Sequence, residues 1–538
     1  MILHGKGVSE GIAIGTVTLY NRKTITATHS QFTTAMKEVG RFHVARLKVK
    51  AQLNDMKTSA EAGGDEIHAN ILSSYITLLD DPEYIAYIGR NIKEKEMSAE
   101  DAVIYVRDSL GNMFTSMEDE YMQTRAADIV DVGNRIVAAL MGKSIVAPML
   151  SNRAILVAED LTPSETIALD KDKILAIITK KGSSLSHTAI LARSMGIPAI
   201  VGINFPPECE GRRIIVDGFT GDIIISPDEE TLFEYRAKQA KAFKEQESLS
   251  NMLDLPSVTS DGKHIALLAN VGSIPEIENA IAKGAEGIGL LRTEFLYMDS
   301  DTYPSEDAQY EAYKKALEVL DGRKLTIRTL DLGADKKTPY LHMAQEANPA
   351  LGMRAIRYCL THTDLFKIQL RAIYRASACG DVSLLIPMIT SLSEVHEIKR
   401  LIEEIKYELD ERNEKYGNPE LGIMIETPAA AMIADILARE VDYLSIGTND
   451  LTQYMLAVDR MNTSLEYLCD YRHEAIMRLL RSVISEGHDN GCRICVCGEL
   501  AADTSFTHEL LQMGVDELSV VPSKIPSVKG SIRDMKFR

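Results

Sequence analysis

Side chains that can bind anions, bind metals or move protons follow short apolar runs in the second half of this sequence. Arg292 follows GLL, Glu426 follows GIMI and Cys497 follows RICV. Further residues of this kind lie in or near such runs: Arg328, Asp331, Asn449, Asp450, Arg354 and Arg460. Guanidinium groups bind phosphate and carboxylate oxygens bidentately, and carboxylates from neighbouring strands suit Mg²⁺. A single Arg is more often part of a surface ion pair, but the whole set predicts an anionic substrate held with a divalent cation.

Cys497 lies in one short segment with Cys492 and Cys495. Three interpretations fit this segment. The thiols are inert core groups, they form a structural zinc site, or Cys497 does acid–base chemistry at a strand end near Glu499. No second Cys/His cluster lies nearby, which disfavours zinc.

His187 follows a strand-like run, ILAIIT, and a turn rich in Gly and Ser. An Ala/Leu-rich segment after it predicts a helix that has His187 in its first turn. The positive end of a helix favours a neutral imidazole, which can attack phosphorus, and its free N–H groups would bind the transferred phosphate. The alternative is that His187 caps this helix.

The elements that must position these residues can be read from the hydrophobic pattern. Eight apolar runs, mostly separated by helical patterns, follow Ile265: IALLAN, GIGLL, LTIRTLDL, VSLLIPMI, LGIMIE, DYLSIG, CRICVCGE and DELSVV. Eight such βα units predict a TIM barrel, in which functional groups lie at the carboxyl ends of the strands.

The first half of the chain predicts a smaller α/β domain. One or two strands are expected in residues 2–20, and more in the β-branched runs from 144 to about 227. Residues 33–141 carry helical spacing and predict about four helices inserted into this domain. The expected domains are 1–30 with 144–228 (α/β), 31–143 (helical), 229–255 (linker helix) and 256–538 (barrel).

Composition limits the possible partners. Lys and Arg number 59 and Asp and Glu 78, which gives a net charge of −19. So acidic a chain is not expected to bind nucleic acid or an anionic membrane. No apolar run is long enough for a membrane helix, and no secretory signal is recognisable at the N-terminus. An odd number of cysteines, 7, favours reduced thiols and a cytoplasmic location.

Several segments resemble those of phosphoenolpyruvate-utilising enzymes. The segment SHTAILARSMGIPAIVG around His187 resembles their phosphohistidine motif, and DLTPSET (160–166) lies upstream of it. Other matching segments are GAEGIGLLRTEFLYMD, TIRTLDLGADKKTPY, NPALGMRAIR, IETPAA, SIGTNDLTQYMLAVDR and VCGELAAD. Their order and spacing are most similar to the enzyme I family of the bacterial phosphoenolpyruvate-dependent sugar phosphotransferase system.

The resemblance implies a fold, a reaction and roles for single residues. It implies a swivelling phosphohistidine domain with an inserted helical subdomain, followed by a TIM barrel that binds phosphoenolpyruvate and Mg²⁺. His187 would take the phosphoryl group and pass it to a histidine of the phosphocarrier HPr, with release of pyruvate. The implied roles are phosphate binding by Arg292 and Arg328, substrate binding by Asn449, Asp450 and Arg460, metal binding by Glu426 and Asp450, proton donation by Cys497 and support of His187 by Thr166. The helical subdomain would bind HPr, and the barrel would form a homodimer.

Two features depart from the family pattern. Residues 182–187 read GSSLSH, where members commonly have GGxTSH, so Ser183 and Leu185 are expected to alter loop motion or phosphohistidine stability. The chain also ends at Arg538, before the further helical tail of typical members, and the strength of the dimer without that tail stays an open question.

Alternatives remain for the partner surface and for the activity. Asp65, Glu66, Asp80, Asp81 and Glu83 form an acidic cluster that is either a solvated face or a surface for a basic partner. The other activities are those of a non-catalytic regulatory phosphoprotein and of a pyruvate–phosphate dikinase or phosphoenolpyruvate synthase. The latter two need an ATP-binding domain, and no Gly-rich phosphate loop precedes Asp160.

Overall fold

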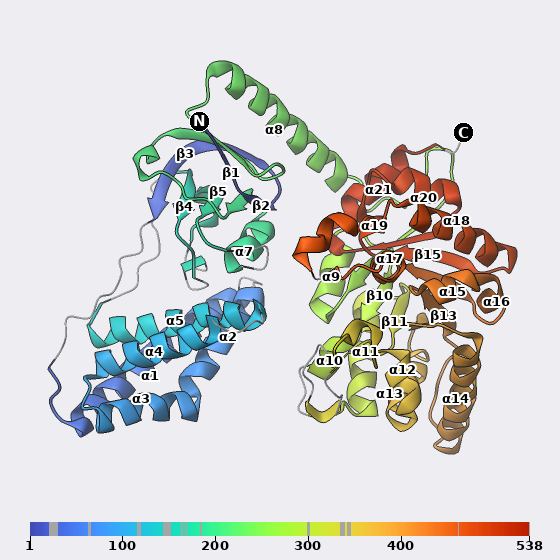
Figure 1. The fold of residues 1–538 in the computed structure, drawn as a ribbon, viewed down its shortest axis with the longest axis horizontal. Coiled ribbons are helices and arrows are strands. Elements are labelled where there is room, and N and C mark those ends of the chain that lie inside the picture. Colours follow the sequence, from blue (N-terminus) through green and yellow to red (C-terminus); the bar gives the residue numbers. More distant parts are fainter. Residues whose placement is uncertain are drawn as a thin grey trace. The chain divides into compact units, whose positions relative to one another are not determined.

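The protein divides into two compact units, Met1–Glu245 and Gln246–Arg538, each of which is described by itself (Figure 1). The structure is a computed structural model. It describes residues 1–538 except 21–30, 63–65, 116–119, 144–151, 163–164, 167–168, 183–185, 299–301, 334–338, 342–345, 461 and 537–538.

The first unit contains an eight-stranded sheet with the order β1-β8-β7-β3-β4-β5-β6-β2. Its strands are β1 (Ile2–His4), β2 (Lys6–Ser9), β3 (Ile12–Tyr20), β4 (Ala154–Ala158), β5 (Ile174–Thr179), β6 (Ala199–Val201), β7 (Arg213–Asp217) and β8 (Asp222–Ile225). Residues 2–20 form three strands instead of the expected one or two. Gly5 separates the first two, and Gly11, with φ of 130°, lies just before the third. Glycine tolerates a positive φ, so the chain turns there.

Five helices are described between β3 and β4, whereas the sequence predicts about four. They are α1 (Ala35–Ala62), α2 (Glu66–Asp80), α3 (Pro82–Glu94), α4 (Ala99–Thr115) and α5 (Glu120–Leu140). Since β3 and β4 pair in parallel, the helices are an insertion between neighbouring strands. The α3–α4 break lacks Gly and Pro; Glu96 has φ of 51° there, and the Ser98 hydroxyl accepts from Asp101 N.

Two further helices are described in the first unit, one of which lies within it and one of which leads out of it. The short helix α7 (His187–Met195) packs against β5 and β2. The helix α8 (Glu229–Ser250) begins where the linker helix expected over 229–255 begins and ends five residues before it, and the division between the two units falls inside α8.

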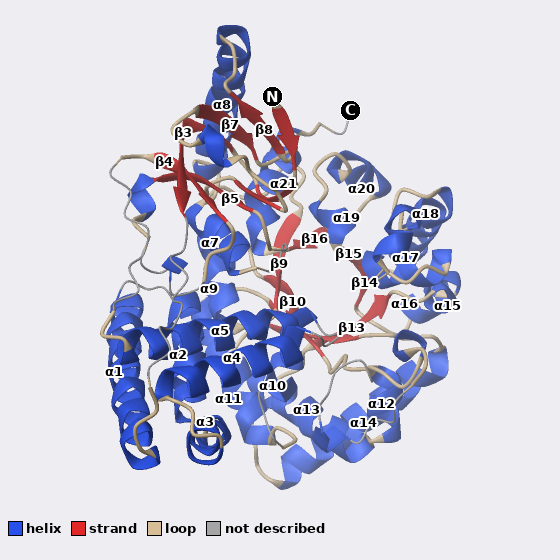
Figure 2. Ribbon diagram, turned by 60° about the vertical axis from the view of Figure 1, so that its left-hand side comes forward, coloured by secondary structure: helices blue, strands red, loops and turns tan. Residues whose placement is uncertain are grey.

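The second unit is a closed barrel of eight parallel strands, as the sequence predicts. The strands are β9 (Ala266–Val271), β10 (Ile288–Arg292), β11 (Leu325–Arg328), β12 (Val382–Ile386), β13 (Glu420–Ile425), β14 (Tyr443–Gly447), β15 (Arg493–Cys497) and β16 (Glu517–Val520). Each overlaps one of the eight predicted runs, and β9, β10 and β13 each extend one residue beyond theirs. Figure 2 shows barrel strands in red with helices in blue around them.

Thirteen helices are described in the second unit. They are α9 (Ile274–Ala282), α10 (Glu294–Met298), α11 (Glu306–Leu320), α12 (Ile356–Thr361), α13 (Thr363–Ala376), α14 (Leu392–Glu411), α15 (Pro428–Met432), α16 (Ala434–Ala438), α17 (Thr448–Leu456), α18 (Glu474–Asp489), α19 (Glu499–Ala502), α20 (Thr507–Met513) and α21 (Ile525–Asp534). After the last strand, α21 packs against β9 and so covers the seam at which the barrel closes.

Alternation along the strands separates two apolar layers. Outward side chains, such as Ile423, Leu444 and Ile494, join the helices in a large buried cluster. Inward side chains form a smaller cluster: Leu290, Leu385, Met424, Tyr443 and Cys497. This inner cluster is the apolar floor beneath the carboxyl ends of the strands.

Candidate active site

The residues selected from the barrel sequence line one cavity of about 780 Å³. It contains Arg292, Arg328, Asp331, Arg354, Glu426, Asn449, Asp450, Arg460 and Cys497. Arg292, Arg328 and Cys497 are the last residues of β10, β11 and β15, and Glu426 directly follows β13. Their positions follow from the barrel itself, because parallel strands bring all their carboxyl ends to one rim.

Arg328 is held by two buried carboxylates. Its Nη2 atom lies 2.7 Å from Glu294 Oε1, and its Nη1 atom lies 3.0 Å from Asp331 Oδ2. Burial by itself lowers the pKa of Arg328, but Glu294, Asp331 and Glu426 outweigh that effect and raise it. The guanidinium is therefore charged and fixed in orientation.

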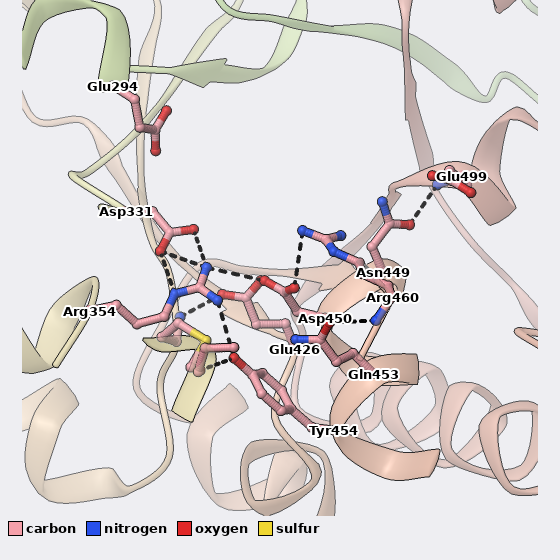
Figure 3. Close-up of polar contacts among 12 residues, drawn as sticks. Glu294, Asp331, Arg354, Glu426, Asn449, Asp450, Gln453, Tyr454, Arg460 and Glu499 are labelled. Carbon is pink, nitrogen blue, oxygen red and sulfur yellow. Dashed lines mark hydrogen bonds and ion pairs between the residues drawn. The ribbon is translucent and has the colours of Figure 1, made fainter. Parts of the chain in front are cut away.

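Arg354 links the two sides of the cavity (Figure 3). Its Nη2 atom lies 2.8 Å from Asp331 Oδ1 and 3.3 Å from Asp450 Oδ2, and its Nη1 atom donates to Tyr454 Oη at 3.1 Å. Burial lowers the pKa of Arg354, but Asp331 and Asp450 raise it by more. Glu294 and Tyr454, which are partners of these arginines, are not among the residues predicted from the sequence. The feature that could have identified them is their position: Glu294 lies in the first turn of α10, and Tyr454 lies late in α17.

Arg292 and Arg460 have more freedom. Arg292 is exposed at the end of β10, and no hydrogen bond or ion pair joins it to another described residue. Arg460 Nη2 lies 3.5 Å from Asp450 Oδ1, and its side chain is 41% exposed. These two cations can bind an incoming anion with less competition from carboxylates.

Glu426 and Asp450 form a buried pair of carboxylates at the cavity floor. Glu426 Oε1 accepts from the Met388 amide at 2.6 Å. Burial, and then the charges of Asp450 and Asp331, raise the pKa of Glu426 to about 8. Asp450 Oδ1 is buried and has no hydrogen bond.

This pair fits Mg²⁺ better than zinc. Among the described residues, no group of three or more His, Cys, Asp or Glu side chains could hold a metal ion. Mg²⁺ commonly takes one or two carboxylates and completes its shell with water and phosphate oxygens. Asp450 Oδ1 accepts no hydrogen bond from a described residue and is paired only with the Arg460 guanidinium at 3.5 Å, so it is a suitable ligand.

Cys497 lies at the boundary between this polar cavity and the apolar floor. Its Sγ atom is 3.5 Å from Ser445 Oγ and 3.4 Å from Ile446 O. Burial raises the pKa of Cys497 to about 11, although the Ser445 hydrogen bond opposes the shift. The group is therefore a protonated thiol at neutral pH.

The interpretation of Cys492, Cys495 and Cys497 as a zinc site is wrong. Cys492 belongs to the outer apolar layer, where its Sγ atom donates to Ala438 O at 3.1 Å and to Val441 O at 3.2 Å. Cys497 belongs to the inner layer. Alternation along the strand puts Cys495 and Cys497 on the inner face and Cys492 on the outer side, so the three thiols do not converge.

His187 is the first residue of α7, as predicted. Capping by His187 is wrong, because Ser186 is the N-cap residue and its Oγ atom accepts from Ala189 N at 3.4 Å. Thr166 is buried. Its predicted hydrogen bond to His187 stays a prediction, because the His187 side chain lies outside the described residues, as do Ser183 and Leu185.

The acidic cluster of the helical block is partly structural. Asp80 Oδ2 lies 2.5 Å from Lys50 Nζ, and Asp81 is the N-cap of α3, where it accepts from Glu83 N at 2.7 Å. Asp65 and the Glu66 side chain lie outside the described residues. Within the described part of the chain, no helix combines the length and apolar character needed to span a membrane.

Comparison with known proteins gives matches to three family models. They are "PEP-utilising enzyme, N-terminal" over residues 4–125, "PEP-utilising enzyme, mobile domain" over 150–221 and "PEP-utilising enzyme, PEP-binding domain" over 246–537. The third model covers the second unit, which holds the cavity.

Two curated relatives resemble nearly the whole chain. A phosphoenolpyruvate-protein phosphotransferase of Staphylococcus carnosus (strain TM300) is 40% identical over 99% of this chain and 94% of its own length. One of Priestia megaterium is 39% identical over the same shares. A solution NMR structure of "Enzyme I (nEIt)" is 35% identical, with a TM-score of 0.38, and covers 45% of this chain and 99% of that one.

Proposed function

Because the chain belongs to the family of phosphoenolpyruvate-protein phosphotransferases, we propose that it phosphorylates its own His187 from phosphoenolpyruvate. It then transfers the group to a histidine of the phosphocarrier HPr, releases pyruvate, and so begins sugar uptake by the phosphotransferase system. The observation that carries the proposal is the single cavity in which residues from separate strands combine cations, two carboxylates and a thiol.

The arginines bind the two anionic ends of the substrate. Arg292 and Arg328 hold the phosphate, since Arg292 has no ion-pair partner in the described part of the chain and Arg328 is fixed in orientation by Glu294. Arg460 and Asn449 bind the carboxylate end. Asn449 Oδ1 accepts from Glu499 N at 3.0 Å, which directs the amide oxygen away from the substrate and leaves the NH₂ group as the donor.

Glu426 and Asp450 would hold Mg²⁺. The cation would supply positive charge that neutralises phosphate oxygens as the phosphoryl group transfers. The chain's own arginines do the same from fixed positions, and this preorganised charge stabilises a transition state without further rearrangement.

Cys497 protonates the carbon of the leaving group. Loss of the phosphoryl group from phosphoenolpyruvate leaves the enolate of pyruvate. The S–H bond of Cys497 breaks, a C–H bond forms at the methylene carbon, and the thiolate later takes a proton from solvent. The raised pKa of Cys497, about 11, keeps the thiol protonated until that moment.

His187 is the phosphoryl acceptor, and Thr166 fixes its tautomer. The positive end of α7 favours a neutral, nucleophilic ring. The helices α1–α5 bind HPr, and the barrel forms a homodimer. The protein acts in the cytoplasm. Family membership supports these assignments, and it does not favour the regulatory or dikinase alternatives.

Labelling separates the activities. The protein is incubated with phosphoenolpyruvate labelled in the phosphoryl group and Mg²⁺, without ATP. We expect an acid-labile label that is absent from a His187→Ala variant and that passes to added HPr. A requirement for ATP would indicate a dikinase, and no label at all would indicate a regulator; either result would refute the proposal.

A further inference from the structure

Ser445 places a hydroxyl group in the apolar interior of the barrel. It lies in the middle of β14 and its side chain is 1% exposed. Its neighbours in strand register are Met424 in β13 and Cys495 in β15. A hydroxyl buried among apolar groups costs free energy unless it has a hydrogen-bond partner.

The partner of this hydroxyl is the thiol at the cavity floor. Ser445 Oγ donates to Cys497 Sγ at 3.5 Å, from the adjacent strand and two residue pairs deeper in the barrel. The hydroxyl also lies beside Cys495. Of these two thiols, only that of Cys497 lines the cavity.

The residue beside this thiol on β14 has no side chain. Gly447 is the register partner of Cys497. A Cβ atom at Gly447 would lie only 3.0 Å from Glu426 Oε2 and 3.1 Å from Met424 Sδ. The residue pattern of β14 therefore sets a hydroxyl below the sulfur, and at the level of the sulfur a glycine whose neighbours Glu426 and Met424 leave no room for a side chain.

We propose that Ser445 is a positioning residue for carbon protonation, which it assists by donating its hydroxyl hydrogen bond to the sulfur of Cys497. This inference rests on the proposed function. When the S–H proton moves to the enolate carbon, the sulfur becomes negative inside an apolar layer. The Ser445 hydrogen bond then becomes a bond to an anion, which is stronger than one to a neutral thiol. The bond therefore stabilises the thiolate more than the thiol and favours proton release.

The experiment separates proton transfer from phosphoryl transfer. The protein is held with phosphoenolpyruvate, pyruvate and Mg²⁺ in D₂O, and NMR follows deuterium entry into the pyruvate methyl group. Exchange of a labelled phosphoryl group between phosphoenolpyruvate and the enzyme measures the rate of the phosphoryl-transfer step. We expect Ser445→Ala to slow deuterium entry about 10- to 100-fold, as for the loss of a hydrogen bond to a charged group, and to leave labelling of His187 within about threefold of wild type.

A matched control and a double variant exclude a merely structural role. Ser383 is also a fully buried barrel serine, but it donates to Glu420 Oε2, so Ser383→Ala should leave deuterium entry unchanged. In a Cys497→Ala background, Ser445→Ala should cause no further loss, because Ser445 acts through the sulfur. The inference would be overturned if deuterium entered pyruvate as fast with Ser445→Ala as with the Ser383→Ala control. It would also be overturned if Ser445→Ala slowed deuterium entry equally with and without Cys497.

Two other outcomes would contradict the proposed function and not the role of Ser445. If Cys497→Ala leaves deuterium entry intact, the proton-donor role itself is wrong, and absence of label on His187 refutes the phosphotransferase activity. Should Ser445→Ala not fold, Ser445→Cys replaces it. Its weaker S–H donor should slow deuterium entry with phosphoryl labelling intact, and an unchanged rate would refute the role of the hydroxyl.

Discussion

The charged residues of the cavity differ in how firmly they are held. Arg328 and Arg354 are buried against carboxylates, which fix their orientation. Arg292 is exposed and has no ion-pair partner among the described residues. The cavity thus combines preorganised cations with one that can follow the substrate, an arrangement suited to a group that must be bound, transferred and released.

The role of Cys497 predicts a split between half-reactions. Cys497→Ala removes the proton donor, so turnover of phosphoenolpyruvate to pyruvate should fall about 10²- to 10⁴-fold. Phosphoryl passage from already labelled His187 to HPr needs no carbon protonation and should change little. Single-turnover measurements of each step check this, and equal losses in both would contradict the role.

The pH dependence of alkylation reports the state of the Cys497 thiol. Only the thiolate reacts, and burial raises the pKa of Cys497 to about 11. The thiol is therefore protonated below that pH, and its alkylation by iodoacetamide should rise about tenfold per unit from pH 8 to pH 10. Peptide mass spectrometry measures the rate, with the exposed Cys379 as the control for reagent access. A rate that levels off below pH 9 would show an unshifted thiol.

Removal of one carboxylate should weaken the response to metal. Glu426→Gln keeps the size of the side chain but cannot lose a proton to become the carboxylate that would bind the cation, so the Mg²⁺ concentration for half-maximal labelling of His187 should rise at least about tenfold. Asp459→Asn removes a carboxylate from the same cavity that we do not assign to the metal and is the control. Equal effects of the two substitutions would mean that only the overall charge matters.

At the scale of elements, strand ends and turns bring the functional groups to the rim. Met388 follows β12 with φ of 60°, a rare value for a residue with a side chain, and its amide donates to Glu426. In the interior, Gly422 of β13 lies against the ring of Tyr443. These local features depend on one particular backbone path, and each constrains which residue can occupy its position.

Gly422 should not tolerate a larger residue. A Cβ atom there would lie 2.2 Å from Tyr443 Cζ, and Tyr443 is fully buried. Gly422→Ala should therefore destabilise the barrel by about 1–3 kcal/mol. Gly89→Ala in α3, where nothing lies within 4 Å of the new atom, should instead stabilise by up to about 1 kcal/mol. Urea unfolding of both variants checks this, and an unchanged midpoint for Gly422→Ala would show that the ring moves freely.

At the scale of the whole molecule, the proposed nucleophile and the cavity proposed to bind the substrate belong to different compact units. His187 lies in Met1–Glu245 and the cavity in Gln246–Arg538. Each unit has its own apolar cores, with one in the helical block and another in the barrel. Such units are expected to unfold as separate cooperative transitions.

Ligand binding should therefore stabilise one transition only. Phosphoenolpyruvate with Mg²⁺ at about 100 times the dissociation constant should stabilise the barrel by about 2.7 kcal/mol. A His187→Ala variant, which cannot be phosphorylated, allows the calorimetric scan to be recorded without turnover. A single transition, or an equal rise of both midpoints, would show that the units unfold together.

The amino-acid sequence by itself determined the barrel, the eight strands and the residues at their carboxyl ends. Strong alternation and regular spacing are local properties, and the topology of a parallel barrel then brings Arg292, Glu426 and Cys497 to one rim. The sequence also located the inserted helices, because helical spacing replaces the strand pattern there.

Only the tertiary structure decided which groups touch. The pairing of Arg328 with Glu294, the separation of Cys492 from Cys497 and the contact of Ser445 with that thiol all depend on strand register and side-chain direction. A sequence pattern carries no such register between strands that are distant in the chain. Capping by Ser186 rather than His187 likewise depends on a backbone conformation that residue type alone leaves open.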